Sequence, residues 1–488
     1  MSGQKKITQI AMRVGETERQ SLISFSSTII LTFVGFLSTA YFAHSLGAGL
    51  LGEYWIFLAY FGVFSVISDF GISGAAVKKI SEGGDIDEYF TASLLIRLIL
   101  TSVTVAIIIF LAFLFVDFSE TGLFPYLIIA LILSGFSSVI SAGVYAKGKV
   151  GINQISLLAD SLFRIAIQVA FVYAGFRTGG LAAGFIAGIT VAILINIKYL
   201  KITFKRFSKK HIKNLFGFSF WTFLSSAFIC VTAYAGTILI GYFMKSSDAG
   251  VYTTTLALTS VVTFSASALN TALYPKFCRW YAEQKTDFIE NALSGIFTYS
   301  FLLALPAVCG GIILGKEILY YLYGADFAIG YSALLFLFAA QFAQIFVIAA
   351  LMTVNSAGHP GWTFRVYAVQ SFLILVLSFY LIPLIGISGA ALAVMIANIS
   401  GAAISLWYAG QFAKIRYQKI QIRNIILSSV LMTVFLLISK EILLPDTWYK
   451  TIILVLAGGI LYFIILLKAD KNLKNDLKKI LLDIGIRI

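Results

Sequence analysis

Long apolar segments recur along this chain, and they limit the available folds more than any other feature. A helix needs about 20 apolar residues to cross the hydrocarbon layer of a membrane. We count fourteen segments of roughly that length. They cover residues 21–45, 51–76, 91–116, 122–146, 152–176, 180–199, 215–243, 250–275, 292–315, 328–355, 366–384, 387–410, 424–440 and 449–468. The sequence therefore predicts an all-α polytopic membrane protein with about 14 transmembrane helices.

Composition excludes the main alternatives to a membrane protein. Hydrophobic residues make up 59% of the chain and charged residues 12%, whereas a soluble domain carries roughly 25% charged residues. The three cysteines, Cys230, Cys278 and Cys309, are dispersed and no histidine lies at ligand spacing from them, so we expect neither a metal site nor a disulfide. The net charge of +14 lies in short loops where membrane topology explains it, and nucleic acid is not an expected partner.

The basic residues give the orientation. Of the 36 Lys and Arg residues, 29 fall in every second gap between apolar segments and five fall in the alternate gaps. Basic loops face the cytoplasm, so the pattern predicts a cell membrane protein whose N- and C-termini are both cytoplasmic. The remaining two cations, Arg97 and Arg164, lie inside apolar segments.

An internal repeat appears when the chain is shifted against itself by 198 residues. Gly52 then meets Gly250, Tyr54 meets Tyr252, and Lys78 meets Lys276. Halves with an even number of spans share one orientation, which predicts two six-helix lobes related by a pseudo-two-fold axis along the membrane normal, plus two extra C-terminal helices. The expected parts are a cytoplasmic segment 1–20, an N-lobe 21–199, a basic linker 200–214, a C-lobe 215–410, the extra helices 411–468 and a basic tail 469–488.

Several short stretches resemble one family in order. They are SLGAGLLGEYW at 45–55, SDFGISGAAVK at 68–78, LYPK at 273–276, LYGADF at 322–327 and GISGAA at 386–391. Together they resemble the polysaccharide flippases of the O-antigen type, in the MATE-like (MOP) superfamily, over essentially the whole chain. The resemblance implies a central cavity that opens alternately to each side and carries polyprenyl-(pyro)phosphate-linked oligosaccharide from the cytoplasmic to the outer leaflet.

The same resemblance sets the expected partners. These are the lipid-linked oligosaccharide, membrane lipids and the enzymes that assemble polysaccharide, with the chain acting as a monomer. No cofactor is expected, and a gradient of H⁺ or Na⁺ is the energy source to consider. The chain is expected to be a transporter and not an enzyme.

Polar residues inside the apolar segments are the candidate site. Asn153, Asp160, Arg164 and Gln168 recur at intervals of 7, 4 and 4, which places them on one helix face. Asp160 and Arg164 have the spacing of an i, i+4 ion pair. A cation suits a phosphate or acidic sugar, and amides suit sugar hydroxyls. The alternative is that the ion pair only holds the helix to its neighbours.

Four further residues complete the candidate set. Arg97 lies inside the third segment, near its cytoplasmic end, and Asp69 lies near the cytoplasmic end of the second segment, so the two could form an ion pair. Alternatively, Arg97 could snorkel to the lipid headgroups, and Asp69 could serve at a helix end. In the second half, Asn270 belongs to an uncharged polar stripe on the eighth segment, which could instead only join helices to each other. Arg365 begins the eleventh segment and could equally be a topology residue.

Two other functions compete with the flippase. A cation-coupled drug exporter of the same superfamily commonly carries acids in its first or seventh span, but 21–45 and 215–243 contain no Asp or Glu. A membrane-embedded glycan polymerase or ligase would favour a large outer loop with acids or histidines, and no outer gap is long enough.

Overall fold

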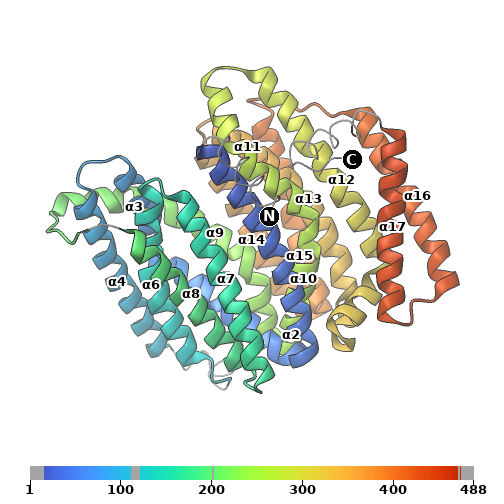
Figure 1. Cartoon of the computed structure of the whole chain (residues 1–488), viewed down its shortest axis with the longest axis horizontal. Coiled ribbons are helices and arrows are strands. Elements are labelled where there is room, and N and C mark those ends of the chain that lie inside the picture. Colours follow the sequence, from blue (N-terminus) through green and yellow to red (C-terminus); the bar gives the residue numbers. More distant parts are fainter. Residues whose placement is uncertain (1–15, 112–120, 201–202, 471–472, 474–488) are drawn as a thin grey trace, which may run out of the picture. The chain divides into compact units, whose positions relative to one another are not determined.

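The computed structural model describes residues 16–111, 121–200, 203–470 and 473. All regular structure within these ranges is helical, without any strand. Contacts divide the chain into two units, Met1–Gly250 and Val251–Ile488. Each unit has its own packed helices (Figure 1).

The first unit is built on one long kinked helix and six shorter ones. These are α2 (Glu16–Asp69), α3 (Ile72–Ser81), α4 (Ile86–Phe110), α6 (Phe124–Ala146), α7 (Val150–Tyr173), α8 (Thr178–Leu200) and α9 (Lys209–Phe243). Helix α8 packs on both α6 and α7, while α9 packs on α2, α3 and α4. Buried side chains of α3, α4 and α6 form a continuous apolar core around Ile72, Phe90 and Val139.

Helix α2 contains most of the first two predicted segments. At about 1.5 Å per residue its 54 residues are far longer than one membrane crossing requires. The backbone leaves helical geometry at Gly47, with φ 73° and ψ 174°, between the two segments. The second segment was predicted to run to residue 76 but ends at Asp69, because Phe70 and Gly71 adopt positive φ angles and α3 starts afresh at Ile72.

The second unit contains the remaining helices. These are α10 (Ser246–Thr259), which begins in the first unit, α11 (Phe264–Ala282), α12 (Thr286–Ile318), α13 (Tyr331–Ser356), α14 (Pro360–Ile385), α15 (Ile387–Ala409), α16 (Lys419–Leu443) and α17 (Trp448–Ala469). Helix α15 packs on α13 and α14. Helices α16 and α17 lie side by side (Figure 1), and Lys440 of α16 is tied to Glu317 of α12 at 2.8 Å.

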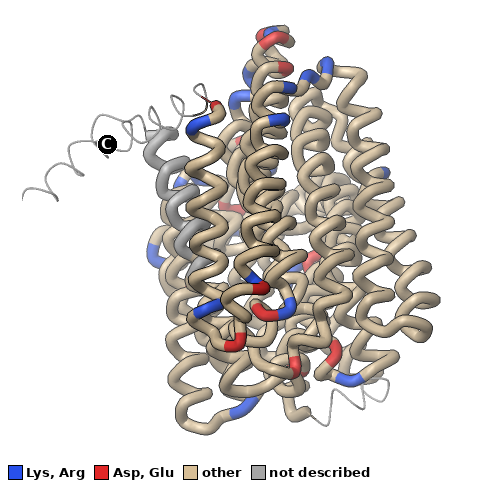
Figure 2. Tube along the Cα trace, turned by 90° about the vertical axis from the view of Figure 1, so that its right-hand side faces the viewer, with Lys and Arg blue, Asp and Glu red and all other residues tan. Residues whose placement is uncertain are grey.

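The predicted all-α polytopic membrane fold is confirmed. Thirteen stretches of helix in the described residues are long and apolar enough to span a membrane, and the first of them, Val34–Asp69, holds parts of two predicted segments. Lys, Arg, Asp and Glu gather toward the helix ends, and long middle stretches carry none (Figure 2). The protein is a multi-pass membrane protein.

The predicted linker is anchored to the first unit. Thr203 donates its hydroxyl to the Asp87 carboxylate at 2.6 Å, and Lys205 Nζ lies 3.2 Å from the same group at the start of α4. Because α9 then packs on α2 and α3, the contacts divide the chain after Gly250 and not within 200–214. The lobe boundaries drawn from the repeat stay a prediction, and the segment 1–20 and tail 469–488 lie largely outside the described residues.

Candidate functional site

The charged face of α7 carries the predicted ion pair. Arg164 Nη2 lies 3.6 Å from Asp160 Oδ2 and donates to Ser161 Oγ at 3.0 Å. The guanidinium also lies 5.5 Å from the ring centroid of Phe185 on α8, a cation–π distance. Both charged side chains are partly buried, so the pair is neither sealed in a core nor free in solvent.

The pair is a loose one. A charge-assisted hydrogen bond between nitrogen and carboxylate is about 2.7–2.9 Å long, well below the 3.6 Å found here. The second carboxylate oxygen, Asp160 Oδ1, is buried and accepts no hydrogen bond from the protein. A buried acceptor without a donor costs about 1–3 kcal/mol, or more for a charged group.

Two glycines of α8 allow that helix to pack closely against the charged face of α7. A Cβ atom on Gly188 would collide with Asp160 Oδ1, and one on Gly184 would collide with the Gln168 side chain. Small residues four apart let membrane helices approach closely. The spacing of Gly184 and Gly188 is visible in the sixth apolar segment, but these glycines were not among the predicted site residues.

Gln168, the last residue of the polar face on α7, belongs to a hydrogen-bond network between helices. Its amide nitrogen donates to the Tyr54 hydroxyl and to the Leu181 carbonyl oxygen, both at 2.8 Å. The side chain is buried and joins α7 to α2 and α8. At the other end of the face, Asn153 has a buried Oδ1 without a hydrogen-bond partner. The four predicted residues thus share a face but not an environment.

The second predicted pair is present. Arg97 Nη1 of α4 lies 3.5 Å from Asp69 Oδ1 at the end of α2. The expectation that Arg97 could snorkel to the headgroups is wrong, because its side chain is 1% exposed. Asp69 also accepts a hydrogen bond from Ser73 in the first turn of α3, so it serves both a helix end and an ion pair.

The remaining candidates belong to the second unit. Asn270 is partly buried on α11, and Arg365 is exposed on the second turn of α14. A buried network in this unit was not predicted. Gln370 donates to Asn398 Oδ1 at 3.1 Å, and Asn398 donates to the Ala340 carbonyl oxygen at 3.1 Å. These amides join α14, α15 and α13.

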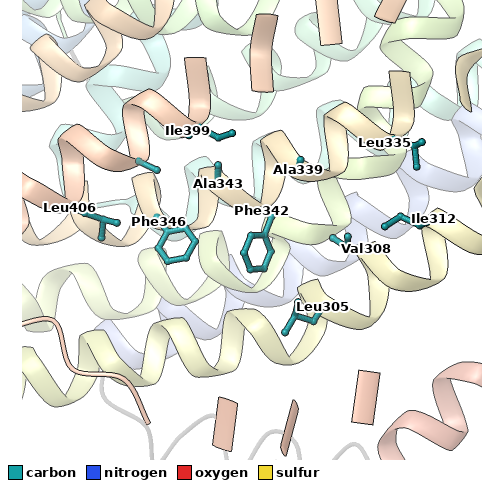
Figure 3. A pocket seen from close by; sticks show the side chains of 11 residues that line it. Leu305, Val308, Ile312, Leu335, Ala339, Phe342, Ala343, Phe346, Ile399 and Leu406 are labelled. Carbon is teal, nitrogen blue, oxygen red and sulfur yellow. The ribbon is translucent and has the colours of Figure 1, made fainter. Parts of the chain in front are cut away.

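An apolar pocket lies among α12, α13 and α15. Its volume is about 560 Å³, and every residue that lines it is apolar. Figure 3 shows the rings of Phe342 and Phe346 on α13, with Leu305 of α12 opposite them. The pocket offers no group for a phosphate or a sugar hydroxyl, in contrast to the charged clusters of the first unit.

Fold and polar clusters together define a multi-pass membrane protein with charged groups held at the depth of its apolar spans. The fold is that of the MOP superfamily. It is similar to the lipid II flippase MurJ in an inward closed conformation, with a TM-score of 0.75, 16% identity, and coverage of 90% of this chain and 97% of that chain. It is also similar to an inward-facing MATE multidrug resistance transporter, with a TM-score of 0.65, 16% identity, and coverage of 80% and 98%.

The chain belongs to the polysaccharide biosynthesis protein family, which residues 49–330 match. Two relatives come from Haloferax volcanii. Agl15, a probable low-salt glycan biosynthesis flippase, is 25% identical over 91% of this chain and 94% of its own length. AglR, a probable flippase, is 23% identical over 95% of this chain and 98% of its own length. The predicted family is confirmed.

Proposed function

We propose that this protein is a flippase that moves polyprenyl-(pyro)phosphate-linked oligosaccharide from the cytoplasmic to the outer leaflet. The observation that carries the proposal is the loose Asp160–Arg164 pair on α7, in a chain of the polysaccharide biosynthesis family. Relatives named as flippases along nearly the whole chain support the same function. The product would serve cell-surface polysaccharide or glycoconjugate synthesis.

The physical demands of such a cargo agree with the site. A glycan headgroup must cross the apolar layer while its hydroxyls and phosphate stay hydrogen-bonded, because an unpaired polar group there is costly. The first unit offers two arginines and several amide and hydroxyl groups within its membrane spans. We propose that Arg97, Asn153, Asp160 and Arg164 contact the cargo and that Gln168 holds the face in place.

The drug exporter is the less favoured function. The acids that usually bind the coupling ion in such exporters are absent from 21–45 and 215–243. The inward-facing MATE structure also fits this fold less closely than MurJ does, with TM-scores of 0.65 and 0.75. The cationic residues suit an anionic cargo better than a cationic drug. The proposal also makes the chain a transporter and not an enzyme.

We extend the proposal to orientation and energy. The distribution of basic residues supports cytoplasmic N- and C-termini. Alternating access driven by a gradient of H⁺ or Na⁺ is proposed as the energy source, with the chain working as a monomer among membrane lipids. An ionophore that collapses the gradient should then slow glycan export in intact cells.

Loss of the gene tests the function. A strain without it should accumulate lipid-linked oligosaccharide on the inner leaflet and lose surface glycan, while efflux of cationic dyes stays normal. A plasmid copy should restore the glycan. Normal surface glycan together with reduced dye efflux would contradict the proposal and select the drug exporter.

A further inference from the structure

A small polar cavity surrounds Arg97 in the first unit. Its volume is about 250 Å³, and it lies among α2, α3, α4, α6 and α9. Four serines from four helices line it together with the ion pair: Ser65, Ser73, Ser138 and Ser226. The polar lining of the cavity thus comes from several helices that pack around Arg97, and not from a row of residues on one helix.

Arg97 is buried there without enough acceptors. Its side chain is 1% exposed, and its Nε atom has no hydrogen-bond partner. The contacts of Nη1 are long, at 3.5 Å to Asp69 Oδ1 and 3.4 Å to the Ser65 carbonyl oxygen. Since a guanidinium has five N–H donors in a planar fork, this geometry leaves room for a second, better-placed oxyanion.

The surroundings favour an anion over a cation. The first turn of α3 borders the cavity through Gly71 and Ser73, and a helix N-terminus carries unpaired N–H groups and a partial positive charge. Asp69 is already engaged by Ser73 and Arg97. A cation would also meet the full charge of Arg97, whereas an oxyanion would gain from the guanidinium, the hydroxyls and the helix end together.

We propose that this cavity binds the phosphate or pyrophosphate group that joins the glycan to its lipid. The inference rests on the proposed function and assigns the oxyanion to Arg97. In the empty site Asp69 holds the guanidinium through a long contact; in the loaded site the phosphate replaces that contact with a bidentate one. The Asp160–Arg164 face is then left to contact the sugars.

The volume of the cavity agrees with the assignment of the phosphate to Arg97 and of the sugars to the Asp160–Arg164 face. At about 30 Å³ per water molecule, the cavity has room for about eight waters, which is enough for a pyrophosphate but not for an oligosaccharide. Ser226 places one wall of the cavity on α9, whose neighbouring backbone at Ser219 packs directly against Gly71. The cavity is therefore complete only while α9 lies against α2 and α3.

Binding to purified protein tests the proposal. Titration calorimetry would compare a short-chain polyprenyl diphosphate, the matching polyprenol without phosphate, inorganic pyrophosphate and phosphatidylglycerol. We expect binding of polyprenyl diphosphate, weaker binding of inorganic pyrophosphate and no binding of polyprenol. Phosphatidylglycerol bound as tightly as polyprenyl diphosphate would overturn the cargo assignment and make the cavity a phospholipid headgroup site.

Four variants separate binding from folding. Arg97→Gln should weaken diphosphate binding about 10- to 100-fold, the range expected for lost charged hydrogen bonds. Asp69→Asn should tighten it, because the competitor for the guanidinium loses its charge; a purely structural pair predicts weaker binding instead. Ser226→Ala should weaken binding several-fold. Ser225→Ala is the matched control, since that hydroxyl donates to the Trp221 carbonyl oxygen at 3.1 Å and does not line the cavity.

The outcomes distinguish this inference from the proposed function. If Arg97→Gln does not yield folded protein, Asp69→Asn and Ser226→Ala decide. Unchanged diphosphate affinity in Asp69→Asn and Ser226→Ala would overturn the cavity assignment while glycan export by the wild type still stands. Normal glycan export in a strain without the gene would overturn the function itself, whatever the cavity binds.

Discussion

Gly52 of α2 and Gly250 of α10 touch backbone to backbone. A Cβ atom on Gly52 would lie 2.9 Å from Gly250 N, and one on Gly250 would lie 3.0 Å from Gly52 N. The same two positions correspond under the 198-residue repeat. Contact between equivalent residues is what a two-fold relationship between these two stretches predicts. Each glycine is required because the facing backbone occupies the space of a side chain, with Ser246 O nearest to Gly52 and Ala48 O nearest to Gly250.

This contact gives the first prediction. Gly52→Ala should lower the melting temperature of the purified protein, because overpacking typically costs about 1–3 kcal/mol. Gly49→Ala is the control three residues away, where a Cβ would meet nothing within 4 Å. Equal melting temperatures for the two variants would show that the contact is not tight.

The second prediction concerns Arg164. Arg164→Ala should abolish surface glycan while the protein still inserts at normal levels. Arg164→Lys should keep part of the activity, because an ammonium retains the charge but not the planar fork. Asp160→Asn should be milder than Arg164→Ala, since its proposed role is to hold the guanidinium between transport cycles. Membrane abundance and glycan export are measured together.

A purely structural pair predicts another result. Removing one partner of a buried ion pair strands the other, so both single variants would then be degraded. A double Asp160→Ala, Arg164→Ala variant would recover expression and export, because the coupling energy is lost as a unit. A fully active double variant would remove α7 from the translocation path.

The third prediction tests how α8 supports the site. Gly188→Ala should reduce glycan export, because the added methyl collides with Asp160 Oδ1 and displaces the pair. Gly179→Ala on the same helix adds a methyl at an ordinary contact distance, 3.5 Å from the Tyr126 hydroxyl, and should export normally. Equal glycan export by the two variants, at equal membrane abundance, would show that the close packing at Gly188 is not needed for transport.

The fourth prediction separates Gln168 from its neighbours on α7. Tyr54→Phe leaves the Gln168 amide with one fewer acceptor and should destabilise the protein by about 0.5–1.5 kcal/mol. Gln168→Leu should cost more, because it also removes the side-chain donor of the Leu181 carbonyl oxygen. Thermal unfolding of the two single variants and of the double variant gives the coupling free energy between Tyr54 and Gln168. A loss of export at unchanged stability would show instead that Gln168 contacts the cargo.

The fifth prediction concerns topology. Reporter fusions after residues 210 and 480 should report the cytoplasm, and fusions after 247 and 445 the outer side, following the 29-to-5 distribution of basic residues. An inverted result between 210 and 247 would break the fourteen-span arrangement.

The positions of the helices were predictable because they depend on local sequence. About 20 apolar residues span a membrane wherever they occur, so each of the fourteen segments is mostly helical within the described residues. The pairing of Asp160 with Arg164 follows from helical periodicity alone, and the structure confirms it at 3.6 Å. The break at Phe70 and Gly71 was missed, because the apolar run continues through it.

What the polar residues do was decided by tertiary structure, because it depends on contacts between residues far apart in the chain. Gln168 shares a helix face with Arg164, yet its amide nitrogen donates a hydrogen bond to Tyr54 of α2. Arg97 had the length to reach the headgroups, but α2 and α3 bring Asp69 and a serine-lined cavity to it and bury it instead. Periodicity assigns a residue to a face of its own helix, whereas only the packing of other helices determines what that face meets.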